Sequence, residues 1–131
     1  MIKMPDKPEK NEDLLEELVE RVFCARNASH LEHWATNSFS IHTALGEFYD
    51  AIIDKIDEIV EVYQGSYGVQ NLECDYEDYC KGKAVKWIPE HVSWIYVNRD
   101  GICKKNSMLV NIVEELLAIY ARTHYKLENL K

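Results

Sequence analysis

A long amphipathic segment over residues 39–64 constrains the fold of this chain more than any other feature. Its apolar side chains recur at helical spacing for more than three heptads: Ile41, Leu45, Phe48, Tyr49, Ile52, Ile56, Ile59, Val60 and Tyr63. Such a stripe is typical of a helix that buries one face and leaves the opposite face in water. The segment therefore predicts one long amphipathic helix.

Two more segments have the same periodicity, one on each side of this stripe. Residues 12–35 follow a plausible N-cap at Asn11 and begin with acidic side chains, which the positive end of a helix dipole favours. Residues 107–130 carry an apolar face that consists of Leu109, Ile112, Val113, Leu116, Ile119, Tyr120, Thr123 and Leu127. Both segments predict helices.

Capping and turn residues predict the ends of the long central helix. A short polar stretch precedes it, with Ser38 or Ser40 as the expected N-cap, and Gly65 is the expected C-terminal cap. Residues 65–84 contain glycines and a group of acidic side chains without clear periodicity. They predict an irregular segment between the second and third helices.

The segment around residues 85–97 has two interpretations. Its apolar spacing favours a third helix, in which Pro89 either lies in the first turn or kinks the helix. β-branched and aromatic side chains at 92–97 leave a strand as the alternative, and Asp100-Gly101 predicts a turn after the segment. Four helices, two of them long and joined by a tight connection, predict an all-α four-helix bundle.

Length and composition agree with one domain. The chain has 131 residues, 47% of them apolar and 29% charged, which is enough for one core but not for a second full-sized module. Residues 1–10 hold two prolines and three lysines and predict a flexible tail, so the helical domain is expected over 11–131. The chain has no run of 18 apolar residues and no apolar signal region at its start, so no membrane association is expected. We expect a cytoplasmic protein whose four cysteines are reduced.

The net charge of −8, from 15 basic and 23 acidic residues, is unevenly distributed. Residues 46–61 have a net charge of −5, whereas residues 79–106 have a net charge of +4. Binding to nucleic acid through the whole surface needs clustered basic side chains, so a nucleic-acid partner is not expected. Three aromatic residues are interleaved with the basic ones: Trp87, Trp94 and Tyr96. This pattern can bind single strands, but we favour an ordinary amphipathic helix with a lysine-rich outer face.

Two histidines and two carboxylates form the candidate metal site. His33 and His42 lie on either side of the tight connection, and Asp57 and Glu61 are one helical turn apart. Imidazole and carboxylate ligands together suit iron, manganese or zinc. His42 and Asp57 are about 22 Å apart along one helix, at about 1.5 Å per residue, so one chain cannot bring them to one ion. A second, antiparallel copy can, which predicts a homodimer or larger homo-oligomer with the site at a two-fold interface.

The same residues resemble the ferroxidase motif of Dps-type mini-ferritins. The matching text is His33-Trp34, Ile41-His42 and Asp57-Glu58-Ile59-Val60-Glu61, within residues 12–64. The resemblance implies a ferritin-like four-helix bundle, often assembled as a hollow dodecamer, that binds iron between subunits. It implies His33 and His42 as ligands from one subunit and Asp57 and Glu61 as ligands from its partner. It also implies oxidation of iron(II) by dioxygen or peroxide.

Other interpretations of these residues remain open. His33 can simply cap its helix, His30 can take its place as a ligand, and the acidic side chains can form a solvated helix face. Gly46 stands where mini-ferritins commonly carry an acidic residue, one turn after the second histidine. His91 and His124 have no acidic partner at ligand spacing and are expected at the surface.

The end of the chain suggests a second hypothesis for function. Residues 125–130 are similar to uncharacterised ferritin-like proteins encoded by bacteriophages. The alternative is therefore a phage-encoded interaction or inhibitor protein with a vestigial metal site. Such a protein would bind a host protein in the host cytoplasm through the acidic helix or through residues 79–106.

Overall fold

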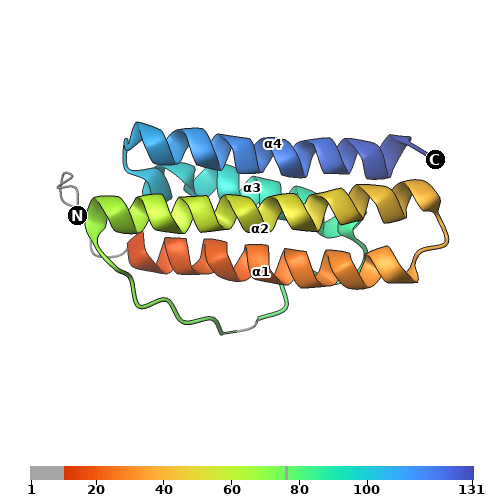
Figure 1. Ribbon diagram of the computed structural model, residues 1–131, viewed down its shortest axis with the longest axis horizontal. Coiled ribbons are helices and arrows are strands. Elements are labelled where there is room, and N and C mark those ends of the chain that lie inside the picture. The colour runs from red at the N-terminus through yellow and green to blue at the C-terminus, as the bar shows by residue number, and fades with distance from the viewer. Residues whose placement is uncertain (1–10, 76) are drawn as a thin grey trace.

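The computed structural model describes residues 11–75 and 77–131, which form four α-helices (Figure 1). The helices are α1 (Asn11–Ala35), α2 (Phe39–Tyr67), α3 (Ala84–Cys103) and α4 (Ser107–Asn129). The predicted all-α four-helix bundle, with an irregular segment between the second and third helices, is confirmed. The predicted N-terminal tail, residues 1–10, lies outside the described residues, as does the side chain of Asn11, the predicted N-cap.

The four helices pack so that every neighbouring pair is antiparallel. α1 contacts α2 and α3, and α4 contacts the same two helices on the other side of the bundle (Figure 1). Tight connections join α1 to α2 and α3 to α4, whereas α2 and α3 are joined by residues 68–83, which we call the crossover. The crossover runs back along the bundle beside α1 (Figure 1). The chain thus consists of two helical hairpins and one long connection.

Most of the predicted apolar stripe of α2 lies in the core of the bundle, whereas its members Ile41, Tyr49 and Val60 are half-buried. The buried residues of α2 are Ala44, Leu45, Phe48, Ile52, Ile56, Ile59, Tyr63 and Ser66. Phe48 packs edge-on against the fully buried Tyr120 of α4, with ring centroids 5.0 Å apart, and its ring centroid lies 6.2 Å from that of Trp87 of α3. These aromatic contacts join three helices at the centre of the core.

The second helix begins where the sequence predicts and ends later. Ser38 is its N-cap, and the Ser38 hydroxyl accepts a hydrogen bond from the backbone N–H of Ile41 at 3.3 Å. The predicted end at Gly65 is wrong, because α2 continues to Tyr67 and Gly68 forms the C-cap at a φ of 96°. The extra residues are held by packing, since Ser66 is buried and the Tyr67 ring lies 4.9 Å from that of Tyr63.

The third segment is a helix and not a strand. Pro89 lies in its second turn, inside the helix. The turn predicted at Asp100-Gly101 is wrong, because Ile102 and Cys103 are fully buried and continue the helix into the core. The helix ends at Cys103, and its C-cap, Lys104, adopts a left-handed conformation with a φ of 51°. No helix in the described part of the chain is both long and apolar enough to cross a membrane.

Candidate functional site

His33 and His42 meet across the connection between α1 and α2. Their rings stack with centroids 3.7 Å apart and planes at 15°. The Nδ1 atom of His33 donates to the backbone carbonyl of His42 at 2.5 Å, and Nδ1 of His42 donates to the carbonyl of His33 at 2.7 Å. A carbonyl oxygen can only accept, so both Nδ1 atoms carry the proton. In the neutral form of each ring, the lone pair is then on Nε2, the atom that can bind a metal.

The local fold explains why these two rings take this position. His33 lies in the last turn of α1, where a carbonyl has no partner within the helix, and the His42 ring supplies one. Gly46 makes room for the His33 ring, because a Cβ there would lie 3.0 Å from His33 Cε1. The glycine that departs from the mini-ferritin pattern thus has a steric role here.

His30 is not equivalent to His33. Its ring packs against Tyr49 at a centroid distance of 4.3 Å and against Trp34 at 4.2 Å. Within the described residues, no hydrogen bond fixes either of its ring nitrogens. His30 is therefore part of an aromatic stack that supports the histidine pair, with its ring centroid 6.1 Å from that of His33.

Asp57 and Glu61 are exposed on α2, far along the helix from the histidine pair. Neither forms an ion pair within the described part of the chain, whereas the nearby Lys55 pairs with Glu58 and with Glu115 of α4. No group of three or more histidine, cysteine, aspartate or glutamate side chains in residues 11–75 and 77–131 is arranged to hold a metal ion. One chain thus brings the two histidines together, but it does not bring Asp57 and Glu61 to them.

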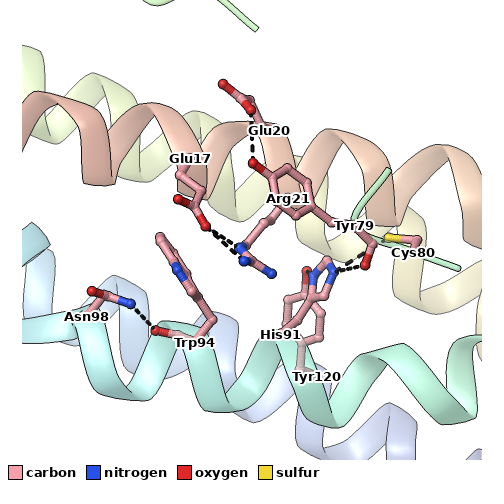
Figure 2. Close-up of polar contacts among 9 residues, drawn as sticks. All are labelled: Glu17, Glu20, Arg21, Tyr79, Cys80, His91, Trp94, Asn98 and Tyr120. Carbon is pink, nitrogen blue, oxygen red and sulfur yellow. Dashed lines mark hydrogen bonds and ion pairs between the residues drawn. The ribbon is translucent and has the colours of Figure 1, made fainter. Parts of the chain in front are cut away.

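A second polar cluster surrounds His91, which sequence reasoning missed (Figure 2). His91 was expected at the surface, and that prediction is wrong because the residue is fully buried. Its Nε2 donates to the carbonyl of Tyr79 at 3.1 Å, so Nδ1 accepts from the hydroxyl of Tyr120, also at 3.1 Å. Burial lowers the pKa of His91 from 6.5 to about 4, and the charge of Arg21 adds to this effect. The ring is neutral at pH 7.

The position of His91 on its helix gives the signal that could have found it. Two buried residues precede it, Trp87 by four positions and Ile88 by three. A third buried residue, Ile95, follows it by four positions. A histidine in register with such an apolar face is expected to face the core. The sequence does not show its partners, because Tyr79 and Tyr120 come from the crossover and from α4.

Arg21 of α1 holds the crossover against the bundle in the same cluster (Figure 2). Its guanidinium lies 4.3 Å from the ring centroid of Tyr79 and 4.7 Å from that of Trp94, and it pairs with Glu17 at 2.8 Å. Burial and the nearby carboxylates raise the pKa of the Tyr79 hydroxyl, which donates to Glu20 at 3.3 Å. These contacts have a structural role, since the guanidinium of Arg21 and the hydroxyl of Tyr79 both have partners inside the protein.

The aromatic residues of the basic segment do not form an exposed platform. Trp87 is buried, and Trp94 lies beneath the Arg21 guanidinium. Arg99 pairs with Glu114 of α4 at 2.6 Å. Stacking of bases needs open aromatic faces, and of these three aromatic residues only Tyr96 is exposed.

Comparison with known proteins places the chain in a family but gives it no function. No curated protein and no solved structure matches the chain. A model of a family of unknown function, DUF5856, matches residues 33–127. That stretch covers most of the chain and includes both histidines of the pair, both carboxylates and His91. The chain therefore belongs to the DUF5856 family.

Proposed function

We propose that the protein binds a transition-metal ion, with iron(II) first and manganese or zinc as alternatives, between two copies of the chain. His33 and His42 of one copy and Asp57 and Glu61 of the other would supply the ligands. The observation that carries the proposal is the reciprocal hydrogen bonding of the histidine pair, which leaves both Nε2 lone pairs without a partner in the described residues. Metal-binding histidines commonly donate their other ring N–H to a carbonyl in this way.

The donor set fits a divalent ion in type and in charge. Two neutral imidazoles and two carboxylates match the preferences of iron, manganese and zinc. The two carboxylates also balance the charge of the ion. Asp57 and Glu61 lie one turn apart on the exposed side of α2, where a second chain can reach them.

The connectivity and the mini-ferritin resemblance support the same function. One long crossover between the second and third helices of a bundle is also the connectivity of ferritin-like folds. On this basis the bound iron is also a substrate, and the site between the two copies would oxidise iron(II) with dioxygen or peroxide. The metal would also promote assembly, because residues 46–61 bring a net charge of −5 from each copy and repel one another without a cation.

Metal uptake and molecular mass, measured together, test this proposal. The protein is titrated with iron(II) without oxygen and analysed by elemental analysis and sedimentation velocity. We expect about one ion per chain and a shift from monomer to dimer or larger. The double variant Asp57→Asn/Glu61→Gln should bind at least about tenfold more weakly, which corresponds to the loss of about 1.4 kcal/mol.

The matched control is Asp50→Asn/Asp54→Asn, which removes the same charge from the same exposed side of α2. It should keep the affinity of the unmodified chain if Asp57 and Glu61 are ligands. Equal weakening in both double variants would mean that the ion responds only to net charge. That result, or no bound iron, manganese or zinc, would refute the proposed site.

A second candidate function rests on exposed apolar side chains at the same end of the bundle. Leu31, Trp34 and Phe39 surround the α1–α2 connection, and their exposed fractions are 64%, 67% and 82%. Exposed apolar clusters mark interaction sites, so this end fits a protein that binds and inhibits a partner. A metal-free monomer would favour this function, provided that it captured a defined protein and lost it in Trp34→Ala.

A further inference from the structure

We propose that Cys24 and Cys80 form an oxidation site, at which a hydroperoxide converts the two thiols to a disulfide that ties the crossover to α1. Cys24 lies on α1, and Cys80 lies near the end of the crossover. All four cysteines are free thiols in the structure. The site is separate from the histidine pair and does not depend on the proposed metal function.

Asp78 lies between the two cysteines and contacts both of them. The interaction of Cys80 with Cys24 is also among the causes that raise the pKa of Cys80. One oxygen of Asp78 accepts the backbone N–H of Cys80 at 3.0 Å and lies 3.9 Å from the Cys24 sulfur. The same carboxylate oxygen thus holds both residues, and formation of the bond requires the two sulfur atoms to approach to the length of a disulfide.

A cavity gives a peroxide access to this pair. It has a volume of about 500 Å³, and its lining comes from α1 and from the crossover. Its lining includes Phe23, Cys24, Leu31, Cys74, Asp78 and Cys80. Cys24 is partly exposed there, whereas Cys80 is buried, so an oxidant entering the cavity meets Cys24 first.

The chemistry follows from these positions. The Cys24 thiol gives its proton to Asp78 and attacks one oxygen of the hydroperoxide. The O–O bond breaks, the leaving oxygen takes the proton as water or an alcohol, and Cys24 becomes a sulfenic acid. The Cys80 thiol then attacks that sulfur and displaces a second water, which completes the disulfide. Two thiols are oxidised by two electrons, and one peroxide is reduced.

The surroundings of Cys80 and Cys74 agree with attack by Cys24 in the first step. Burial and the interaction with Cys24 raise the pKa of Cys80, which keeps this thiol protonated, so Cys80 does not make the first attack on the peroxide. In the second step its proton leaves with the hydroxyl of the sulfenic acid as water. The pKa of Cys74 is also raised, by burial and by the negative charges of Glu20, Glu16 and Asp75. His91 does not act as a base for Cys80, because its Nε2 lies 3.5 Å from the sulfur but donates to Tyr79.

Peptide mapping of the full chain after treatment with hydrogen peroxide tests the proposal. Without reductant we expect a single cross-linked peptide pair that contains Cys24 and Cys80, with a mass loss of about 2 Da. The melting temperature should rise on oxidation and return on reduction, because the bridge restricts the unfolded chain. Cys24→Ser should abolish the bridge and the rise.

Cys74→Ser is the matched control, because it removes another thiol that lines the same cavity and should leave the bridge intact. Circular dichroism confirms that both variants are folded before oxidation. A bridge between Cys24 and Cys74 would overturn the assignment. Sulfinic acid on Cys24 without a bridge, or no reaction of Cys24, would overturn it as well.

Discussion

The histidine pair at the α1–α2 connection and the buried His91 differ in the partner of their second ring nitrogen. In both places a ring nitrogen donates to a backbone carbonyl, which fixes the tautomer. At His91 the second nitrogen accepts from Tyr120 inside the core. At His33 and His42 the second nitrogen has no partner within the described residues. A histidine is available to a ligand only where its second nitrogen has no partner in the fold.

Because His91 has partners inside the core, its substitution should lower the free energy of unfolding more than that of a surface histidine. His91→Ala removes a fully buried ring and leaves the hydroxyl of Tyr120 and the carbonyl of Tyr79 without partners. We expect it to lower the free energy of unfolding by about 2–5 kcal/mol, through a cavity and two unsatisfied groups. Urea denaturation measures this. His124→Ala, at a partly exposed surface position, should cost less than about 1 kcal/mol. Equal losses would remove the distinction.

The pH dependence of stability sharpens the comparison further. The folded-state pKa of His91 is about 4 and its ordinary value is 6.5, so the unfolded chain takes up the proton first as the pH falls. Stability from this group is therefore complete above about pH 6.5 and is lost as the pH falls toward 4, by roughly 2 kcal/mol between pH 7 and 5. Denaturation at several pH values should show this slope, reduced in His91→Gln and retained in His124→Gln. An unchanged slope in His91→Gln would contradict the prediction.

Substitution of two glycines of α2 should have the smallest effect on the free energy of unfolding. The two substitutions form a matched pair. Gly65→Ala places its Cβ in open space, so the gain in helix propensity should stabilise the protein by about 0.5–1 kcal/mol. Gly46→Ala brings the same gain but pushes on the His33 ring from 3.0 Å. We expect a smaller or zero gain in urea denaturation, and shifts of the His33 and His42 ring resonances in NMR spectra. Equal stabilisation with unshifted rings would mean that Gly46 does not position the pair.

Much of the fold could be predicted from the sequence because periodicity and capping are local signals. The stripe of residues 39–64 became the buried face of α2, and Ser38 became its N-cap. The errors at Gly65 and at Asp100-Gly101 share one cause. In both places, residues beyond the local turn signal pack into the bundle and extend the helix. Tertiary packing outweighed turn propensity there.

The candidate site could be predicted only in part for a similar reason. The spacing of His33 and His42 around a short connection predicted that they lie close together, and they do. Their mutual hydrogen bonds could not be predicted, because they depend on the angle at which two helices meet. The hydrogen bond from His91 to Tyr79 and the placement of Cys24 and Cys80 at one cavity depend on the path of the crossover, which has no periodic signal.

The carboxylates of α1 bear on which part of the chain can exist alone. Glu16 accepts the N–H of Glu73, Glu20 accepts the hydroxyl of Tyr79, and Glu32 accepts the N–H of Ala84 at 2.7 Å. The last bond caps α3, because its own N-cap, Lys83, makes no side-chain cap bond. The start of one helix is thus specified from another, 52 residues earlier. The family model matches from residue 33, just after these three acceptors, so residues 33–127 alone would lack the side chain that caps α3.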